Sequence, residues 1–361
     1  MTAVDLGLPL PSLIPASRAP APVDGPLRDT FGRVATDLRV SVTDRCNLRC
    51  TYCMPADGLD WLPTDGVLNT EEFVRVLTVA VRDLGIRTIR FTGGEPLLRR
   101  DLEEIITRVS RLPERPGIAM TTNGLGLGRR VHGLTAAGLT RVNVSLDTVD
   151  PARFAEITRR DRLADVLDGL AAARAAGLDP VKVNAVVPDR SDLDGLAALF
   201  GFCLREGYQL RVIEQMPLDA DHRWDRTAMV TAAEILEALR HVADLTPDDV
   251  PRAGAPAQTW LVDGHTDAAG RRARVGVIAS VTRPFCGDCD RTRLTADGAL
   301  RNCLFAENET SLLPVLRGGE GDVDAAIARL WRENTWAKRA GHSVNSGDFR
   351  QPERPMSAIG G

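Results

Sequence analysis

The sequence predicts an α/β protein built on a partial barrel of six parallel strands. Short β-like runs alternate with longer helical patterns, which is typical of consecutive βα units. Glycines stand directly after the expected helix ends, at Gly85, Gly138, Gly177 and Gly207, where a left-handed C-terminal cap favours them. Six units are fewer than a closed barrel of eight needs, so we expect an open barrel.

The expected elements follow in order along the chain. We expect strands at residues 37–43, 87–92, 117–122, 141–146, 181–187 and 209–214. Helices are expected at 70–84, 101–111, 127–137, 151–176, 191–206 and 231–242. After residue 245 the alternation stops, and a hairpin-like pair at 259–263 and 274–280 lies among Pro- and Gly-rich loops. The tail from residue 343 is expected to be a loop.

Composition narrows the class of protein. The predicted divisions are a Pro/Ala-rich disordered leader (1–30), a barrel (31–245), a C-terminal region (246–342) and a tail (343–361). The leader has no basic start and no continuous apolar stretch, so it does not resemble a signal peptide. A formal charge of −4 argues against general nucleic-acid binding, and no apolar run is long enough to predict a membrane span. We therefore expect a cytoplasmic protein.

The two faces of the predicted strands differ in polarity, because neighbouring strand residues point to opposite sides. One face is mostly aliphatic. The other carries Arg39, Ser41, Thr43, Arg90, Thr92, Gly94, Thr121, Asn123, Asn143, Ser145, Asp147, Lys182, Asn184, Arg211 and Gln215. If this face is the barrel interior, the interior is a wet cavity lined with cations and hydroxyls. The alternative is a half-exposed sheet whose polar face meets solvent.

Six of the seven cysteines form two sets of three. Cys46, Cys50 and Cys53 follow the first predicted strand, where parallel-sheet proteins place active sites. A structural zinc site wants four ligands, whereas a cubane iron–sulfur cluster on three thiolates leaves one iron open. The alternative is a zinc knuckle that recruits a fourth ligand.

The second set is Cys286, Cys289 and Cys303, with arginines at Arg291 and Arg293. In an extended segment both guanidinium groups reach the same side, which suits the oxygens of a polyanion. A zinc ribbon with surface arginines is the alternative. The seventh cysteine, Cys203, lies on an apolar helix face and is expected to be a core thiol, although it could complete one set.

Two further segments carry weaker signals. Gly93, Gly94 and Glu95 follow the second strand, where a Gly-Gly pair alone indicates only a tight turn. Ser145 ends the fourth strand and either caps the next segment or contacts a ligand. The terminal Gly360 and Gly361 would ordinarily be a frayed end.

The C-x3-C-x2-C spacing, with Tyr52 before the last cysteine, resembles the signature of the radical S-adenosylmethionine (SAM) superfamily. In that superfamily the open iron chelates the amine and carboxylate of SAM, and the Gly-Gly-Glu-Pro motif holds the amino group. With Arg-Thr-Arg after the second set and a Gly-Gly ending, the chain from about residue 30 onward resembles the GTP 3′,8-cyclase family.

That resemblance implies two [4Fe-4S] clusters, SAM as cofactor and GTP as substrate, on a partial (β/α)6 barrel of the radical SAM type with a C-terminal cluster-binding extension. The implied SAM contacts are Tyr52, Gly93, Gly94, Glu95, Ser145, Arg211 and Met216. The implied GTP contacts are Arg39, Arg90, Thr121, Lys182, Arg291, Thr292 and Arg293, and Gly360 and Gly361 would support catalysis.

The implied chemistry is removal of the ribose C3′ hydrogen of GTP, followed by bonding of C3′ to purine C8, the first step of molybdenum cofactor biosynthesis. The implied partners are an electron donor, the cyclic pyranopterin monophosphate synthase that uses the product, and a second copy in a homodimer. Two alternatives stay open: a radical SAM peptide maturase with an auxiliary cluster, and a zinc-binding scaffold.

Overall fold

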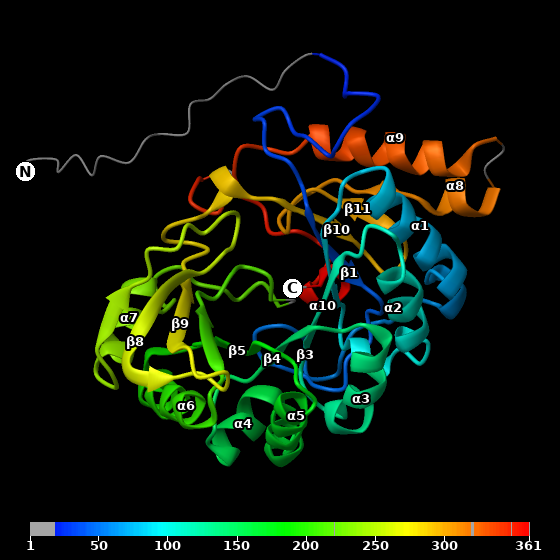
Figure 1. The fold of residues 1–361 in the computed structure, drawn as a ribbon. Helices are drawn as coiled ribbons and strands as arrows, with labels where there is room; N and C mark the ends of the chain where they lie inside the picture. Colours follow the sequence, from blue (N-terminus) through cyan, green and yellow to red (C-terminus); the bar gives the residue numbers. More distant parts are fainter. Residues whose placement is uncertain (1–18, 220, 319–320, 348, 361) are drawn as a thin grey trace, which may run out of the picture.

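The computed structural model describes residues 19–219, 221–318, 321–347 and 349–360. Six parallel strands form the inner wall: β1 (Asp37–Ser41), β2 (Thr88–Thr92), β3 (Gly117–Thr122), β4 (Arg141–Ser145), β5 (Val181–Val186) and β6 (Gln209–Ile213). The helices of this part are α1 (Thr70–Arg82), α2 (Leu102–Ser110), α3 (Leu127–Ala137), α4 (Pro151–Thr158), α5 (Leu163–Ala175), α6 (Leu193–Glu206) and α7 (Ala232–Arg240). Figure 1 shows α1 to α6 around the outside of the strands. The predicted partial barrel is confirmed.

The C-terminal region extends the same sheet at both edges. Its strands are β7 (Leu245–Pro247), β8 (Gln258–Thr266), β9 (Arg272–Ile278), β10 (Arg291–Leu294), β11 (Ala299–Arg301) and β12 (Thr310–Ser311). The order is β12-β11-β10-β1-β2-β3-β4-β5-β6-β9-β8-β7, with β10 parallel to β1 and β9 parallel to β6. Because β12 and β7 are the two ends of this order, the barrel stays open.

Both faces of the inner strands are buried, for different reasons. The aliphatic face, with Val40, Ile89 and Val144 fully buried, packs against the helices. The polar face is also withdrawn from solvent: Arg90 is 6% and Asn143 5% exposed. The prediction of a polar interior is therefore confirmed, and the half-exposed sheet is wrong.

Local signals explain where the helices begin. Asn69 accepts from the Glu72 N–H while Glu72 accepts from the Asn69 N–H, a reciprocal capping box that starts α1. Thr231 and Glu234 make the same arrangement at α7. The single helix expected at 151–176 is wrong, because Arg159 adopts a left-handed φ of 54° and separates α4 from α5.

Three further helices lie near the C-terminus. They are α8 (Leu313–Gly318), α9 (Val323–Trp336) and α10 (Met356–Ile359). The last corrects the expectation of a loop throughout the tail, and Figure 1 shows it at the centre of the strands. At the other end, Leu27 is fully buried and its N–H donates to the Leu84 carbonyl, so the expected leader boundary at residue 30 is too late. Residues 1–18 of that leader lie outside the described part.

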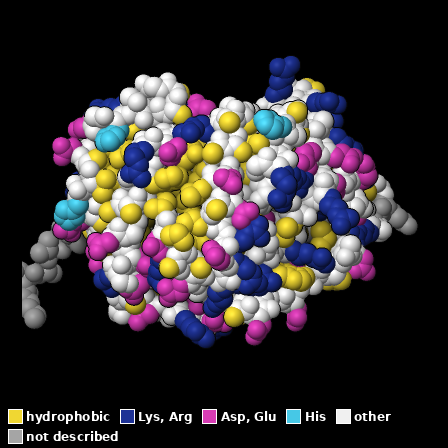
Figure 2. All heavy atoms as spheres, turned by 90° about the horizontal axis from the view of Figure 1, so that it is seen from below, with side chains coloured by type: hydrophobic (Ala, Val, Ile, Leu, Met, Phe, Trp, Pro, Cys, Tyr) yellow, Lys and Arg dark blue, Asp and Glu magenta, His cyan; other side chains and the backbone are white. Residues whose placement is uncertain are grey.

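One face of the molecule carries mixed charges around a hydrophobic area (Figure 2). Figure 2 views the side formed by the lower helices of Figure 1, where basic and acidic side chains are interspersed around a hydrophobic area. Among the described residues, no helix has both the length and the apolar character needed to cross a bilayer.

Candidate active site

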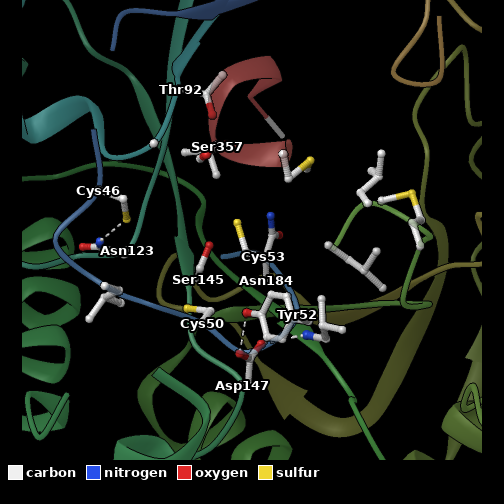
Figure 3. A pocket seen from close by; sticks show the side chains of 18 of the residues that line it. Cys46, Cys50, Tyr52, Cys53, Thr92, Asn123, Ser145, Asp147, Asn184 and Ser357 are labelled. Atoms are coloured by element: carbon white, nitrogen blue, oxygen red, sulfur yellow. Dashed lines mark hydrogen bonds between the residues drawn. The ribbon is translucent and has the colours of Figure 1, made fainter. Parts of the chain in front are cut away.

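The first cysteine set lines a cavity at the carboxyl ends of β1 to β6. Figure 3 shows Cys46, Cys50 and Cys53 around this cavity, with Ser145 and Asn184 from the strands beside them. Met356 and Ser357 of α10 close it from the side of the C-terminus. Parallel strands aim their last side chains at one common space, which is why residues far apart in sequence meet here.

The three cysteines lie close to one another and are half-buried. Burial raises the pKa of Cys53 to about 12, with a further rise from Cys46 nearby. Burial also raises the pKa of Cys50 well above its usual range, with Asp147 and the other two thiols adding to the effect. Because a cationic cluster favours thiolates, this arrangement fits three ligands of one iron–sulfur cluster.

A single metal ion fits less well. Within the described ranges, no group of three or more His, Cys, Asp or Glu side chains closes tightly enough to hold one ion. A cubane is larger than an ion and takes each thiolate on a different iron. The geometry of the three thiols therefore favours the cluster over the zinc knuckle.

Tyr52 is fixed by a buried carboxylate. Its hydroxyl donates to Asp147 Oδ2 at 2.6 Å, and the Val186 N–H donates to Asp147 Oδ1 at 2.8 Å. Burial raises the pKa of Asp147 to about 6. Figure 3 shows the ring of Tyr52 and this carboxylate directed at each other beside Cys50. The pair ties the cysteine loop to the ends of β4 and β5.

The Gly-Gly-Glu segment has a packing role of its own. A Cβ on Gly93 would lie 2.2 Å from the Thr43 carbonyl oxygen, and one on Gly94 would lie 2.2 Å from that of Arg45. Only glycine permits this approach of the loop after β1. The side chain of Glu95 does not line the cavity: it is fully buried and accepts from Leu97 N, Thr122 Oγ1 and Asn123 N. Those three donors hold the carboxylate in place, so a contact of Glu95 with SAM stays a prediction that concerns its backbone.

Met216, another expected SAM contact, is positioned by its neighbour Glu214. The fully buried Glu214 carboxylate accepts from Ala232 N at 2.7 Å, from Val281 N and Thr282 N at 2.8 Å each, and from the Thr282 hydroxyl. It thereby links the end of β6 to the start of α7 and to the loop after β9. Sequence reasoning missed Glu214, because a single acidic residue after a strand carries no signal of burial.

The second cysteine set lines a separate cavity. Cys286, Cys289 and Cys303 face it together with Lys338 and His342. Burial raises the pKa of Cys286 and Cys303, whereas the pKa of Cys289 is lowered. Burial alone would raise the pKa of Cys289, but Lys338 and Arg291 next to it outweigh that effect. The three thiols fit a second cluster for the same reason as the first three.

A group of cationic side chains occupies the barrel interior. It consists of Arg39, Arg90, Arg141, Lys182, Arg211, Arg291 and Arg293, from β1, β2, β4, β5, β6 and β10. Register brings them together: Arg39 pairs with Arg90 on one side and with Arg293 on the other. We call this set the interior cations.

Most of the interior cations form no ion pair with a carboxylate of the described residues. Arg39 pairs with Asp37, but buried nitrogens of Arg90 and Arg211 have no hydrogen-bond partner in the described chain. Burial lowers the pKa of Lys182 to about 6, and the positive charges of Arg211, Arg90 and Arg141 contribute to this effect. Burial likewise lowers the pKa of Arg293 to about 9, with Arg39 and Arg291 contributing. Such uncompensated buried cations are costly, and an anionic ligand would relieve the cost.

The described end of the tail reaches into this interior. The Gly360 carbonyl accepts from an Arg293 guanidinium nitrogen, and a Cβ on Gly360 would lie 2.4 Å from Ser41 Oγ. Burial of Cys53 is shared with α10, since the Ser357 backbone hydrogen-bonds that thiol. The tail is therefore packed, and Gly361 lies outside the described residues.

The other predicted site residues divide between the two parts of the interior. Gly93, Gly94, Tyr52, Thr121, Ser145 and Met216 line the first cavity. Arg211 was expected at SAM, but its charged neighbours are Arg39 and Arg141, so it belongs with the interior cations. The Thr292 hydroxyl accepts from Trp331 Nε1 at 2.9 Å, because alternate residues of β10 point away from the interior, so the expected GTP contact of Thr292 stays a prediction for its backbone.

Comparison with known proteins agrees with this geometry. Residues 40–203 match the Radical SAM superfamily, and residues 208–344 match the Molybdenum Cofactor Synthesis C family. Among solved structures, Streptococcus suis SuiB bound to S-adenosylmethionine has a TM-score of 0.58 at 14% identity, covering 89% of this chain and 76% of that one. Native anSMEcpe with bound AdoMet has a TM-score of 0.56 at 14% identity, covering 82% and 80%. These likenesses show a shared fold.

The fold and the first cavity thus define a radical SAM protein, which takes a [4Fe-4S] cluster and SAM. Curated relatives specify it further. The GTP 3′,8-cyclase of Mycolicibacterium smegmatis is 59% identical over 366 residues, covering 100% of both chains. The GTP 3′,8-cyclase 2 of Mycobacterium tuberculosis is 58% identical over 340 residues, covering 94% of this chain and 93% of that one. The chain belongs to the GTP 3′,8-cyclase family.

Proposed function

We propose that this protein converts GTP to 3′,8-cyclo-7,8-dihydro-GTP, the first step of molybdenum cofactor biosynthesis. The observation that carries the proposal is the set of interior cations, whose member Arg291 lies beside Cys289 of the second cysteine set. GTP brings about four negative charges, which match a cluster of guanidinium and ammonium groups that outnumber the carboxylates beside them, Asp37 and Asp290. A peptide substrate would give no reason for this charge.

The first cavity holds the cofactor in this proposal. Cys46, Cys50 and Cys53 bind a [4Fe-4S] cluster, while Tyr52, Gly93, Gly94, Ser145 and Met216 contact SAM. When bound there, a reduced cluster would supply the electron for the cleavage of SAM that starts removal of the substrate hydrogen. The Tyr52–Asp147 hydrogen bond and the hydrogen bonds of the Glu214 carboxylate keep these SAM contacts at fixed positions. The protein contributes this fixed orientation to the reaction.

The interior cations and the second cysteine set hold the substrate. Arg39, Arg90, Lys182, Arg291 and Arg293 contact the triphosphate, and Thr121 lies on the side of the SAM cavity. The ribose is oriented so that its C3′ hydrogen faces the first cavity. Cys286, Cys289 and Cys303 would hold a second [4Fe-4S] cluster, which would supply an open coordination position for the purine.

Once C3′ has lost its hydrogen, the bound shape of GTP brings that carbon to purine C8, and one further electron and proton complete the product. Gly360 and Gly361 support the step from the C-terminal side, since the Gly360 carbonyl contacts Arg293. The proposal includes a cytoplasmic location, an external electron donor, product use by cyclic pyranopterin monophosphate synthase, and a homodimer that light scattering would test.

The deciding experiment uses GTP carrying deuterium at C3′. Anaerobic protein with SAM and a reductant should transfer that deuterium to 5′-deoxyadenosine and consume GTP in the same proportion. GTP deuterated at C2′ is the control, and its label should stay in the nucleotide. The proposal fails if 5′-deoxyadenosine forms without ever carrying the C3′ label.

Metal analysis separates the remaining alternatives. Anaerobically prepared protein should contain about eight iron and eight sulfide per chain, as two four-iron clusters require. Zinc without iron would identify a scaffold. Two clusters with SAM cleavage that GTP does not affect would instead favour the peptide maturase.

A further inference from the structure

Lys338 is one of only two lysines in a chain whose other basic residues are arginines, and it lies beside the second cysteine set. It follows α9 directly and is 5% exposed. The other lysine, Lys182, belongs to the interior cations. Lys338 does not, so the substrate does not account for its retention.

The ammonium of Lys338 has three acceptors within reach. Nζ donates to the Arg291 carbonyl at 2.8 Å, to the Cys289 carbonyl at 3.3 Å and to Cys289 Sγ at 3.4 Å. A lysine ammonium has three donors, so this set uses all of them. No acidic side chain of the described residues forms an ion pair with it. A buried cation without a carboxylate needs another anion, and the Cys289 thiolate is the group in contact.

These contacts join two parts of the proposed site. Cys289 is a ligand of the proposed second cluster, and Arg291 is one of the interior cations, two residues further along the chain. Lys338 therefore holds the ligand and the start of the phosphate-binding strand β10 in one arrangement. On the opposite side of the set, Arg33 donates to the Cys286 carbonyl and to the carbonyls of Ala340 and Arg339, so it fixes the backbone without contacting a sulfur.

We propose that Lys338 is a positioning residue of the second cluster, which fixes Cys289 and Arg291 together and raises the reduction potential of that cluster through its charge and its N–H···S hydrogen bond. This inference rests on the proposed function, since it requires the second cluster to form. Hydrogen bonds and positive charge at a ligating sulfur favour the more negative, reduced state of a cluster. Removing the ammonium therefore lowers the potential.

The test compares three substitutions in the full chain with both clusters assembled anaerobically. Lys338→Met removes the charge and the donors at similar length, Lys338→Gln keeps donors without charge, and Lys338→Arg keeps the charge. Arg329→Met is the control: Arg329 lies on α9, the helix that precedes Lys338, its side chain is 60% exposed, and it forms an ion pair with Glu333. Each protein is titrated with a redox mediator series followed by electron paramagnetic resonance, with GTP added to identify the second cluster by its altered signal.

We expect Lys338→Met and Lys338→Gln to shift the second cluster to lower potential and to weaken GTP binding on the order of tenfold, which is typical for the loss of a partner of a metal ligand. Lys338→Arg should recover part of the shift, and Arg329→Met should match the parent. Loss of the second cluster alone from Lys338→Met, with its four iron atoms absent and the first cluster retained, also supports the positioning role.

Unchanged potential and unchanged GTP affinity in both neutral variants would overturn the inference. If Lys338→Met does not fold, the comparison of Lys338→Gln with Lys338→Arg decides, and equal potentials in those two count against the charge. A parent protein that binds only one cluster refutes the proposed function itself. That result is seen before any variant is made, so the two failures are distinguishable.

Discussion

The first and second cysteine sets differ in how the chain assembles them and in the charge that surrounds them. The first lies within eight consecutive residues after β1, beside Asp147 and Tyr52. The second brings Cys303 to Cys286 and Cys289 across β10 and β11, beside Lys338 and Arg291. A neutral to acidic setting at one set and a cationic one at the other suits different ligands: a cationic sulfonium at the first and a nucleotide polyphosphate near the second.

The pKa values of the thiols express the same contrast. Burial raises the pKa at each member of the first set, whereas nearby cations lower that of Cys289 in the second. Two sets of equal composition are therefore not interchangeable. Four predictions test this difference between the two sets and the contacts around them.

The largest effect comes from removing one thiolate of each set. Cys46→Ala should lose about four iron atoms and all formation of 5′-deoxyadenosine. Cys303→Ala should also lose about four iron atoms but keep cleaving SAM, because the first cavity is untouched. Iron content and 5′-deoxyadenosine yield measure both. Full cyclisation of GTP by Cys303→Ala would show that the second set has no role in the reaction. Cys203→Ala, in the core, is the control for general loss of stability.

Replacing Lys182 should weaken GTP binding and should also make the affinity for GTP less dependent on pH. The free side chain has a pKa lowered to about 6, so it is mostly neutral above that pH. A bound triphosphate favours the charged form, so binding takes up a proton and GTP affinity falls as pH rises above 6. Calorimetry in two buffers of different ionisation enthalpy measures the proton uptake. At about pH 8 the phosphate groups, whose second pKa is about 6, are already ionised and take up no proton themselves.

In Lys182→Met the proton uptake that is due to Lys182 should be absent. The affinity for GTP should fall by about tenfold, because one ionic hydrogen bond is lost. The remaining cations titrate equally in both proteins, so their contribution cancels in the difference. Equal proton uptake by the parent and Lys182→Met would mean that Lys182 does not contact the phosphates. Iron content should be the same in both.

Glu214→Gln should lower stability by about 2–4 kcal/mol, because an amide nitrogen would face backbone N–H groups that now donate to a carboxylate. SAM affinity should fall as well, since Met216 loses its support. Chemical denaturation and SAM titration test the two effects. Glu234→Gln is the matched control at the same end of α7, where Glu234 pairs with a half-exposed Arg190. Equal losses in the two variants would refute the special role of Glu214.

The smallest effect is expected at an exposed ion pair that joins the C-terminal helix α9 to helix α1 of the barrel. Arg75 on α1 and Asp324 on α9 form an ion pair with both side chains about half exposed, at 47% and 51%. Arg75→Ala should cost less than about 0.5 kcal/mol, because water and salt screen such pairs. Thermal unfolding at low and high salt checks this. A larger loss would mean that the attachment of α9 depends on charge more than on its buried side chains, Ile327 and Trp331.

Much of the barrel was predictable because its signals are local. The six inner strands lie within a few residues of the predicted ranges, since the alternation of strands with helices and the glycine caps are each visible within a short segment of the chain. The break between α4 and α5 was not predictable, because the left-handed turn at Arg159 has no glycine to mark it. α8 and α9 were missed although Asp322 caps α9, because the region was interpreted as loops around a hairpin.

The two cysteine sets, the parity of the inner strands and the motifs can be recognised in the sequence alone, because each depends on spacing along the chain. Long-range packing places Arg141 among the interior cations, directs Thr292 to Trp331 and makes Glu95 hold a loop in place. It also brings Gly360 to Arg293 and Lys338 to Cys289. The physical reason is that burial and long-range contact set a side chain's partner and charge, and neither follows from its neighbours in the chain.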